Sequence, residues 1–128
     1  MATDTGTRVA QHASPDLKHL PDVLNVQERL RRFDPPRRVT THGIDRQVRS
    51  AVEIEVTLSE PFAIRALGPV LWIGEVPLSI AESDGGNTYR FFSFEPERLR
   101  AGAPMALSWG ERGSPRNMTK FQYRPPVP

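Results

Sequence analysis

The chain of 128 residues carries 17 Lys/Arg against 15 Asp/Glu, a net charge of +2, and it contains no cysteine. This length fits one domain, and the missing cysteines exclude a disulfide framework and a thiolate metal site. No apolar run approaches the ~20 residues that span a bilayer, and the N-terminus has no signal-peptide core. We therefore expect a soluble protein without membrane contact, either cytoplasmic or processed before this numbering starts.

Residues 1–45 are expected to form an N-terminal arm that contains a short helix at 21–33. Pro21 suits the first helical position, where a missing N–H costs nothing. Four apolar residues then recur at spacings of three and four, which predicts one helical stripe: Val23, Val26, Leu30 and Phe33. Pro35 and Pro36 would end this helix. The stretch 37–44 reads as extended, with 39–41 as a possible first strand.

Residues 46–110 are expected to form a small antiparallel β-sandwich. Val52, Ile54, Val56 and Leu58 alternate with polar residues, which is the period of a half-buried strand. Turn signals separate further strands at 70–73, 76–80, 88–94 and 105–109, and the connections are too short for the crossover helices of a parallel sheet. Pro77 indicates an edge strand. Phe92 and Phe94 are expected to point inward, and a helical turn at 95–99 to bring Leu99 over the core.

Residues 111–128 are expected to form a basic, proline-rich C-terminal tail. Phe121 and Tyr123 are spaced to line one face of an added strand, which would cover an edge of the sandwich in its own subunit or in a neighbour. The final Pro-Pro-Val-Pro favours a polyproline II conformation.

Two segments of the block 51–110 resemble immunoglobulin-like sandwich modules of bacterial proteins. These are the strand Val52–Leu58 running into Ser59-Glu60-Pro61, and the stretch from Phe94-Glu-Pro to Ala101-Gly-Ala-Pro-Met-Ala-Leu-Ser-Trp109. The resemblance implies an immunoglobulin-like fold. Some such modules, of the copper-resistance type, bind copper through histidine and methionine. Here the block has no histidine and one methionine, Met105, which patterns as core, so we expect no cofactor.

The residues that usually carry catalysis are sparse, which predicts a non-enzymatic protein. His12, His19 and His42 lack companions at zinc-like spacing. Glu53 and Glu55 lie two apart on one strand and could act as an acid–base pair in a cleft. The simpler interpretation is an acidic stripe facing solvent, and Ser108 is likewise expected to face solvent. No catalytic, metal or cofactor-binding residue is predicted.

The charge distribution provides the main functional signal. Residues 1–50 carry nine basic against six acidic residues, 51–110 four against eight, and 111–128 four against one, so an acidic centre separates two basic ends. We expect the ends to contact a protein partner or a second copy, within a homo-oligomer or a larger assembly. The alternative is nucleic acid, bound through arginine-rich arms with interleaved aromatics. The candidate contacts are Arg31, Arg32, Arg37, Arg38, Lys120, Phe121, Tyr123 and Arg124.

Overall fold

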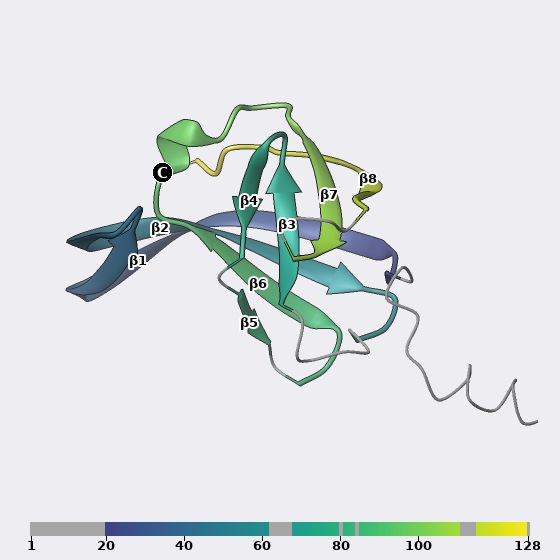
Figure 1. The fold of residues 1–128 in the computed structure, drawn as a ribbon, viewed down its shortest axis with the longest axis horizontal. Helices are drawn as coiled ribbons and strands as arrows, with labels where there is room; N and C mark the ends of the chain where they lie inside the picture. Colours follow the sequence, from purple (N-terminus) through teal and green to yellow (C-terminus); the bar gives the residue numbers. More distant parts are fainter. Residues whose placement is uncertain (1–19, 62–67, 80, 84, 111–114, 128) are drawn as a thin grey trace, which may run out of the picture.

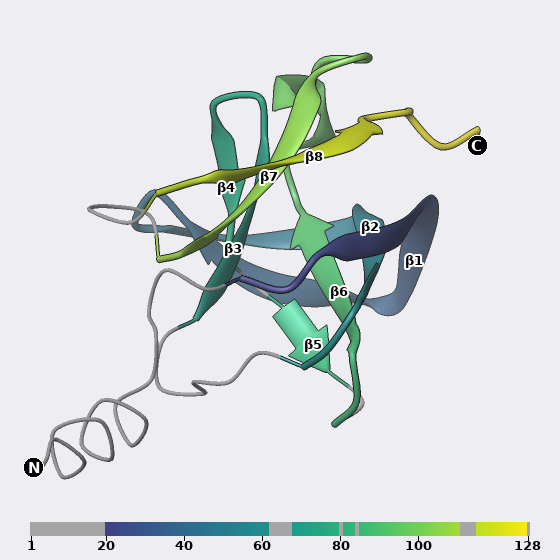
Figure 2. The same cartoon turned by 90° about the vertical axis from the view of Figure 1, so that its right-hand side faces the viewer.

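The computed structural model describes residues 20–61, 68–79, 81–83, 85–110 and 115–127, which form two four-stranded antiparallel sheets (Figures 1 and 2). The first sheet has the order β1-β2-β6-β5 and comprises β1 (Val23–Thr41), β2 (Ile44–Leu58), β6 (Thr88–Ser93) and β5 (Ala81–Ser83). The second has the order β4-β3-β7-β8 and comprises β4 (Val76–Leu78), β3 (Pro69–Ile73), β7 (Pro104–Trp109) and β8 (Asn117–Gln122). The predicted all-β, sandwich-like architecture is thus confirmed.

The predicted helix at 21–33 is wrong, because these residues belong to β1. Val26 pairs with Val56 and Leu30 with Val52, so the first apolar residues of the supposed stripe face the core across an antiparallel ladder. A spacing of four residues satisfies a strand as well as a helix, since four is a multiple of two. The conformation is therefore determined by pairing with β2, whose backbone groups form the ladder with these residues. In the described part of the chain the one helical element is the 3-10 turn η1 (Pro96–Arg98).

The core lies between the two sheets and is filled from both. β2 contributes its alternating apolar face, as predicted, and Leu99 follows η1 into the core. Met105 is fully buried there, which confirms its core assignment. The main buried side chains are Val52, Ile54, Val56, Leu58, Leu71, Ile73, Phe91, Leu99, Met105, Leu107, Trp109 and Tyr123.

The inward assignment of Phe92 and Phe94 is wrong by one residue. Phe91 pairs with Ile54 and is fully buried in the core, whereas Phe92 pairs with Glu53 and therefore lies on the outer face of the first sheet. A shift of one position exchanges the two faces of a strand. The run of adjacent phenylalanines hides this choice in the sequence.

The first and the last described strands, β1 and β8, both contain residues that were predicted to lie in terminal arms. Pro77 lies in the edge strand β4, as predicted. β8 pairs with β7 and so adds a strand to an edge in its own subunit, with Tyr123 buried and Phe121 packed against the core. The predicted division at 45 and 110 stays a prediction. The first part of the predicted arm, residues 1–19 with His12 and His19, lies outside the described residues.

β1 and β2 continue beyond the first sheet as a two-stranded ribbon, residues 32–50, seen at the left of Figure 1. β6 pairs with β2 only between Val52 and Thr57. The register of the ribbon shifts between Arg32 and Arg37, so that the residues between them face Arg49 alone. Its turn uses left-handed conformations at both His42 (φ 53°) and Gly43 (φ 77°), the geometry of a tight type I′ hairpin.

Candidate functional site

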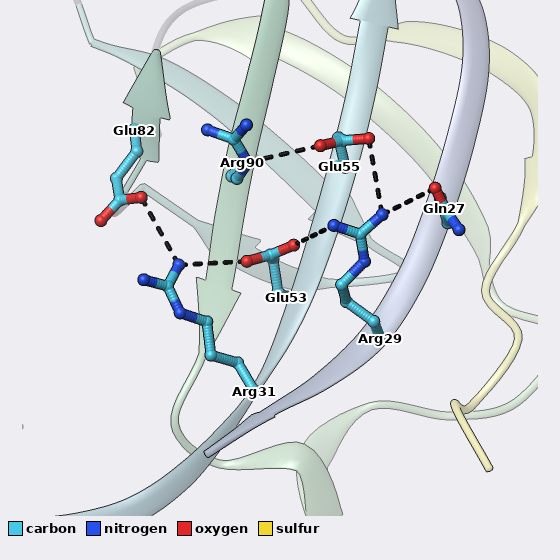
Figure 3. A network of polar contacts seen from close by, with 7 residues as sticks. All are labelled: Gln27, Arg29, Arg31, Glu53, Glu55, Glu82 and Arg90. Atoms are coloured by element: carbon cyan, nitrogen blue, oxygen red, sulfur yellow. Dashed lines mark hydrogen bonds and ion pairs between the residues drawn. The ribbon is translucent and has the colours of Figure 1, made fainter. Parts of the chain in front are cut away.

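The outer face of the first sheet carries a network of arginines and glutamates from all four strands (Figure 3). Alternation along each strand places these side chains on one face, and the register brings opposite charges together: Arg29 pairs with Glu53, and Glu55 with Arg90. Three arginines meet three glutamates, and Gln27 accepts a further hydrogen bond from Arg29 Nη2 at 2.7 Å. The charged members are Arg29, Arg31, Glu53, Glu55, Glu82 and Arg90.

Glu53 is the centre of this network. Its Oε2 accepts a hydrogen bond from Arg29 Nη1 at 3.0 Å and its Oε1 one from Arg31 Nη1 at 3.1 Å. Only 4% of the Glu53 side chain is exposed, because the two guanidinium groups cover it. The expectation of an acidic stripe facing solvent is therefore wrong for Glu53. A carboxylate this buried requires such charge-assisted partners.

The outer contacts extend the network across the sheet. Arg90 Nε lies 3.3 Å from Glu55 Oε2, and Arg31 Nη1 lies 3.6 Å from Glu82 Oε1. Basic residues from the N-terminal segment thus neutralise acidic residues of the centre within the same chain. This pairing removes much of the charge separation seen in the sequence.

An aromatic cluster adjoins the network and engages two of the predicted contact residues. The Phe92 and Phe94 rings are 6.5 Å apart, and the Phe33 and Phe94 rings 6.4 Å apart. The Arg31 guanidinium lies 5.4 Å from the Phe92 ring centre, and that of Arg37 lies 5.6 Å from the Phe33 ring centre. Arg31 and Arg37 therefore both make stacking contacts within the protein.

The ribbon holds a group of arginines that lie outside the network. Within the described ranges, Arg32, Arg38 and Arg49 form no ion pair. Arg46 donates to the backbone oxygen of Phe94 at 2.8 Å, a neutral acceptor. Five arginines against Asp34 and Asp45 give the ribbon a charge of +3.

The predicted contacts in the tail lie at the opposite end of β1 from Arg37 and Arg38. Lys120, Phe121 and Arg124 line a cleft of about 300 Å³ between β8 and the first residues of β1. The Arg124 backbone N–H donates to Glu28 Oε2 at 2.7 Å and ties the tail to β1. Tyr123 points into the core with 3% exposed, so it is a structural residue. Burial, with the charge of Glu28, raises the pKa of the Tyr123 hydroxyl.

A second cavity, of about 420 Å³, lies where the ribbon tip meets β4, the end of β6 and η1. His42 Nε2 is 3.3 Å from Glu95 Oε1, which also accepts a hydrogen bond from Arg98 Nη1 at 3.3 Å. Burial opposes ionisation of Glu95, but the hydrogen bonds and charges of Arg98 and His42 outweigh it, so the pKa of Glu95 lies below its usual range. An ionised Glu95 holds the ribbon tip against η1. No sequence signal joins these residues.

The outer face of the second sheet has its own buried cluster, of Val70, Trp72 and Ala106. Ser108 is fully buried beside it, so the expectation that Ser108 faces solvent is wrong. Its hydroxyl accepts a hydrogen bond from Trp72 Nε1 at 2.8 Å and donates to the Gly110 carbonyl at 2.6 Å. Arg116 lies over the Trp72 ring at 3.5 Å from its centre. Ser108 thus satisfies the buried indole and is no exposed nucleophile.

Comparisons with protein-family models, with curated protein sequences and with solved structures found no match for the chain. In the part of the chain that the structure describes, no helix has the length and apolar character to cross a membrane. The same described residues contain no group of three His, Cys, Asp or Glu side chains placed to hold a metal ion.

Proposed function

We propose that the chain is a non-enzymatic interaction module of immunoglobulin-like type, which binds a protein partner or a second copy along the open edge of its first sheet. Lettering the strands A, B, C, C′, D, E, F and G in chain order turns the two sheets into A-B-E-D and C′-C-F-G. This order agrees with the A-B-E-D and C-F-G sheets of immunoglobulin domains.

The observation that carries the proposal is the edge of β1. This strand has 19 residues, and among the described strands it pairs with β2 alone. Residues 25–32 of this edge pair regularly with β2 and present a row of backbone donors and acceptors to a further strand. The six charges of the outer network are engaged with one another, which supports a structural role for that network over a catalytic one.

The test is the solution mass of the nuclease-treated chain over a range of concentrations, with hydrogen exchange of the β1 amides. A mass above 14.4 kDa that survives nuclease supports the proposal. So does slower β1 exchange in an extract of the producing cells than in buffer. A mass of 14.4 kDa throughout, with β1 exchange unchanged in the extract, refutes it.

The second candidate function is binding of nucleic acid through the ribbon, favoured by the uncompensated Arg38 and Arg49. Pairing of Arg38 with Gln47 makes Arg49 its diagonal neighbour on the same face. A two-stranded ribbon also fits the major groove of DNA. The test compares salt-dependent binding of the Arg38→Ala/Arg49→Ala variant with that of the Lys120→Ala/Arg124→Ala variant. The Arg38→Ala/Arg49→Ala variant is expected to lose more affinity for nucleic acid, and its affinity should depend less steeply on salt concentration. Equal losses, or no salt-dependent binding by the parent chain, would remove this candidate.

A further inference from the structure

We propose that the partner of the β1 edge is a second copy of the same chain, paired antiparallel about a two-fold axis at Leu30. This inference rests on the proposed function and specifies its partner. The regular part of the edge is short and well defined. Residues 25–32 pair with β2 without interruption, and register irregularities bound them at Val23/Asn25 and at Arg32/Arg37.

Symmetry restricts how two such edges can meet. In an isologous pair, residue i contacts residue j of the copy, and j contacts i. A two-fold axis perpendicular to the extended sheet keeps each side chain on its own face. Because successive side chains of a strand alternate between faces, paired positions must differ by an even number. The axis must therefore pass through a single residue.

Charge selects which residue this is. An axis at Glu28 would set two glutamates opposite each other, and an axis at Arg29 would do the same with two arginines. Within the regular run, only an axis at Leu30 sets opposite charges face to face. It pairs Glu28 with Arg32 of the copy, and does so twice by symmetry. Leu30 then meets Leu30 of the copy in the centre.

The present contacts of these side chains suit this arrangement. Glu28, Leu30 and Arg32 pair with Ile54, Val52 and Ser50 of β2, so they share the inner face of the sheet. Among the described residues Arg32 has no ion pair, and Glu28 receives only the Arg124 backbone N–H, on Oε2. The other carboxylate oxygen, Oε1, is therefore open to a guanidinium.

The outer face of the sheet also tolerates an axis at Leu30. This axis sets Arg29 opposite Arg31 of the copy, so two positive charges face each other. Each of these guanidiniums is already held by Glu53, at 3.0 and 3.1 Å, and each has a second glutamate at 3.6 Å. Their repulsion is thereby reduced, and the neutral networks of the two copies lie side by side on one continuous eight-stranded sheet.

A single-cysteine variant tests the axis directly, because the chain has no cysteine of its own. Leu30→Cys places two thiols face to face at the axis, within reach of a disulfide. Mild oxidation is expected to give a covalent dimer. As long as the protein stays dimeric, the rate of cross-linking should not fall on dilution, because the two thiols already face each other. Ile44→Cys, at the exposed ribbon tip, is the control and should cross-link more slowly and in proportion to concentration.

Charge reversal gives the second arm of the test, on the full chain after nuclease treatment. Glu28→Arg and Arg32→Glu are each expected to weaken the dimer about tenfold, since each changes two symmetric contacts by roughly 0.7 kcal/mol. The double variant should recover most of the affinity, and Glu75→Arg, whose side chain is 86% exposed between β3 and β4, should leave it unchanged. A dimer that keeps its affinity in both single variants, with cross-linking of Leu30→Cys no faster than of Ile44→Cys, overturns the inference and leaves the proposed function standing. A monomeric parent with unchanged β1 exchange in the extract overturns both.

Discussion

Replacing Glu53 by glutamine tests whether the buried carboxylate stabilises the first sheet. The change keeps the size of the side chain and removes its charge. Both guanidinium groups that now donate to it, at 3.0 and 3.1 Å, would face a neutral amide. One of the two would have to face the amide N–H₂, which donates and cannot accept.

The loss of stability in Glu53→Gln follows from the two hydrogen bonds and their surroundings. A hydrogen bond to a charged group contributes about 1 kcal/mol more to the free energy of unfolding than a neutral one, so losing the charge at two bonds suggests a loss of about 2 kcal/mol. The side chains of Arg29 and Arg31 are 43% and 40% exposed and keep Glu55 and Glu82 nearby, which reduces the loss by solvent and charge compensation. We expect Glu53→Gln to lower the free energy of unfolding by about 1.5 kcal/mol, or the melting temperature by roughly 5 °C.

The assay is urea and thermal unfolding beside a matched control, Glu75→Gln. Glu75 also pairs with an arginine, Arg116, at 3.1 Å, but its side chain is 86% exposed. Its loss should stay below about 0.5 kcal/mol and vanish at high salt, whereas the loss at Glu53 should persist there. If both variants lose the same stability, the carboxylate of Glu53 contributes no more to stability than an exposed surface charge. That result would refute a stabilising role of the buried network.

Three further predictions concern the fold. Ser108→Ala leaves the buried Trp72 indole N–H without its acceptor and should cost about 1–2 kcal/mol, read from unfolding followed by tryptophan fluorescence; a loss no larger than for the exposed Ser79→Ala would contradict this role. The pKa of Tyr123 is raised on folding, so its contribution is complete below pH ~10, the unfolded value, and is lost as the pH rises through the folded pKa. Tyr123→Phe should therefore flatten the decline of stability at alkaline pH, and an unchanged decline would assign it to other groups. Gly43→Ala, at φ 77°, should cost about 1 kcal/mol by unfolding, and no loss would show that the hairpin turn tolerates a Cβ in this conformation.

Strands with unambiguous alternation could be predicted from the sequence alone. The apolar residues from Val52 to Leu58 fall on one face only if the run is a strand, not if it is a helix. Proline or glycine closes each of the later strands. β1 could not be assigned in this way, because the spacing from Val26 to Leu30 suits both periods and its charged positions carry no signal of burial. The turn at His42 and Gly43 was missed because the stretch 37–44 was interpreted as one extended segment, although a glycine there permits a type I′ hairpin.

The candidate site depended on pairing that local pattern does not contain. Glu53 looked like an exposed strand residue because its arginines lie more than twenty positions earlier, in a segment predicted as helix. Once β1 is a strand, its register places both guanidiniums over that carboxylate. The contact of His42 with Glu95 joins positions 53 apart and exists only because the folded chain places the ribbon tip beside η1.

The two-residue turn between β1 and β2 also bears on the order in which the chain folds. It closes the shortest loop of the first sheet, whereas pairing of β3 with β7 joins Leu71 to Leu107 and must close a much longer one. Hairpins form in roughly 1–10 μs, ahead of such distant contacts. Glu53 and its two arginines all belong to this hairpin, so their ion pairs can assemble before β3 pairs with β7. Glu53→Gln should then slow folding more than it speeds unfolding, which makes the network part of the folding nucleus.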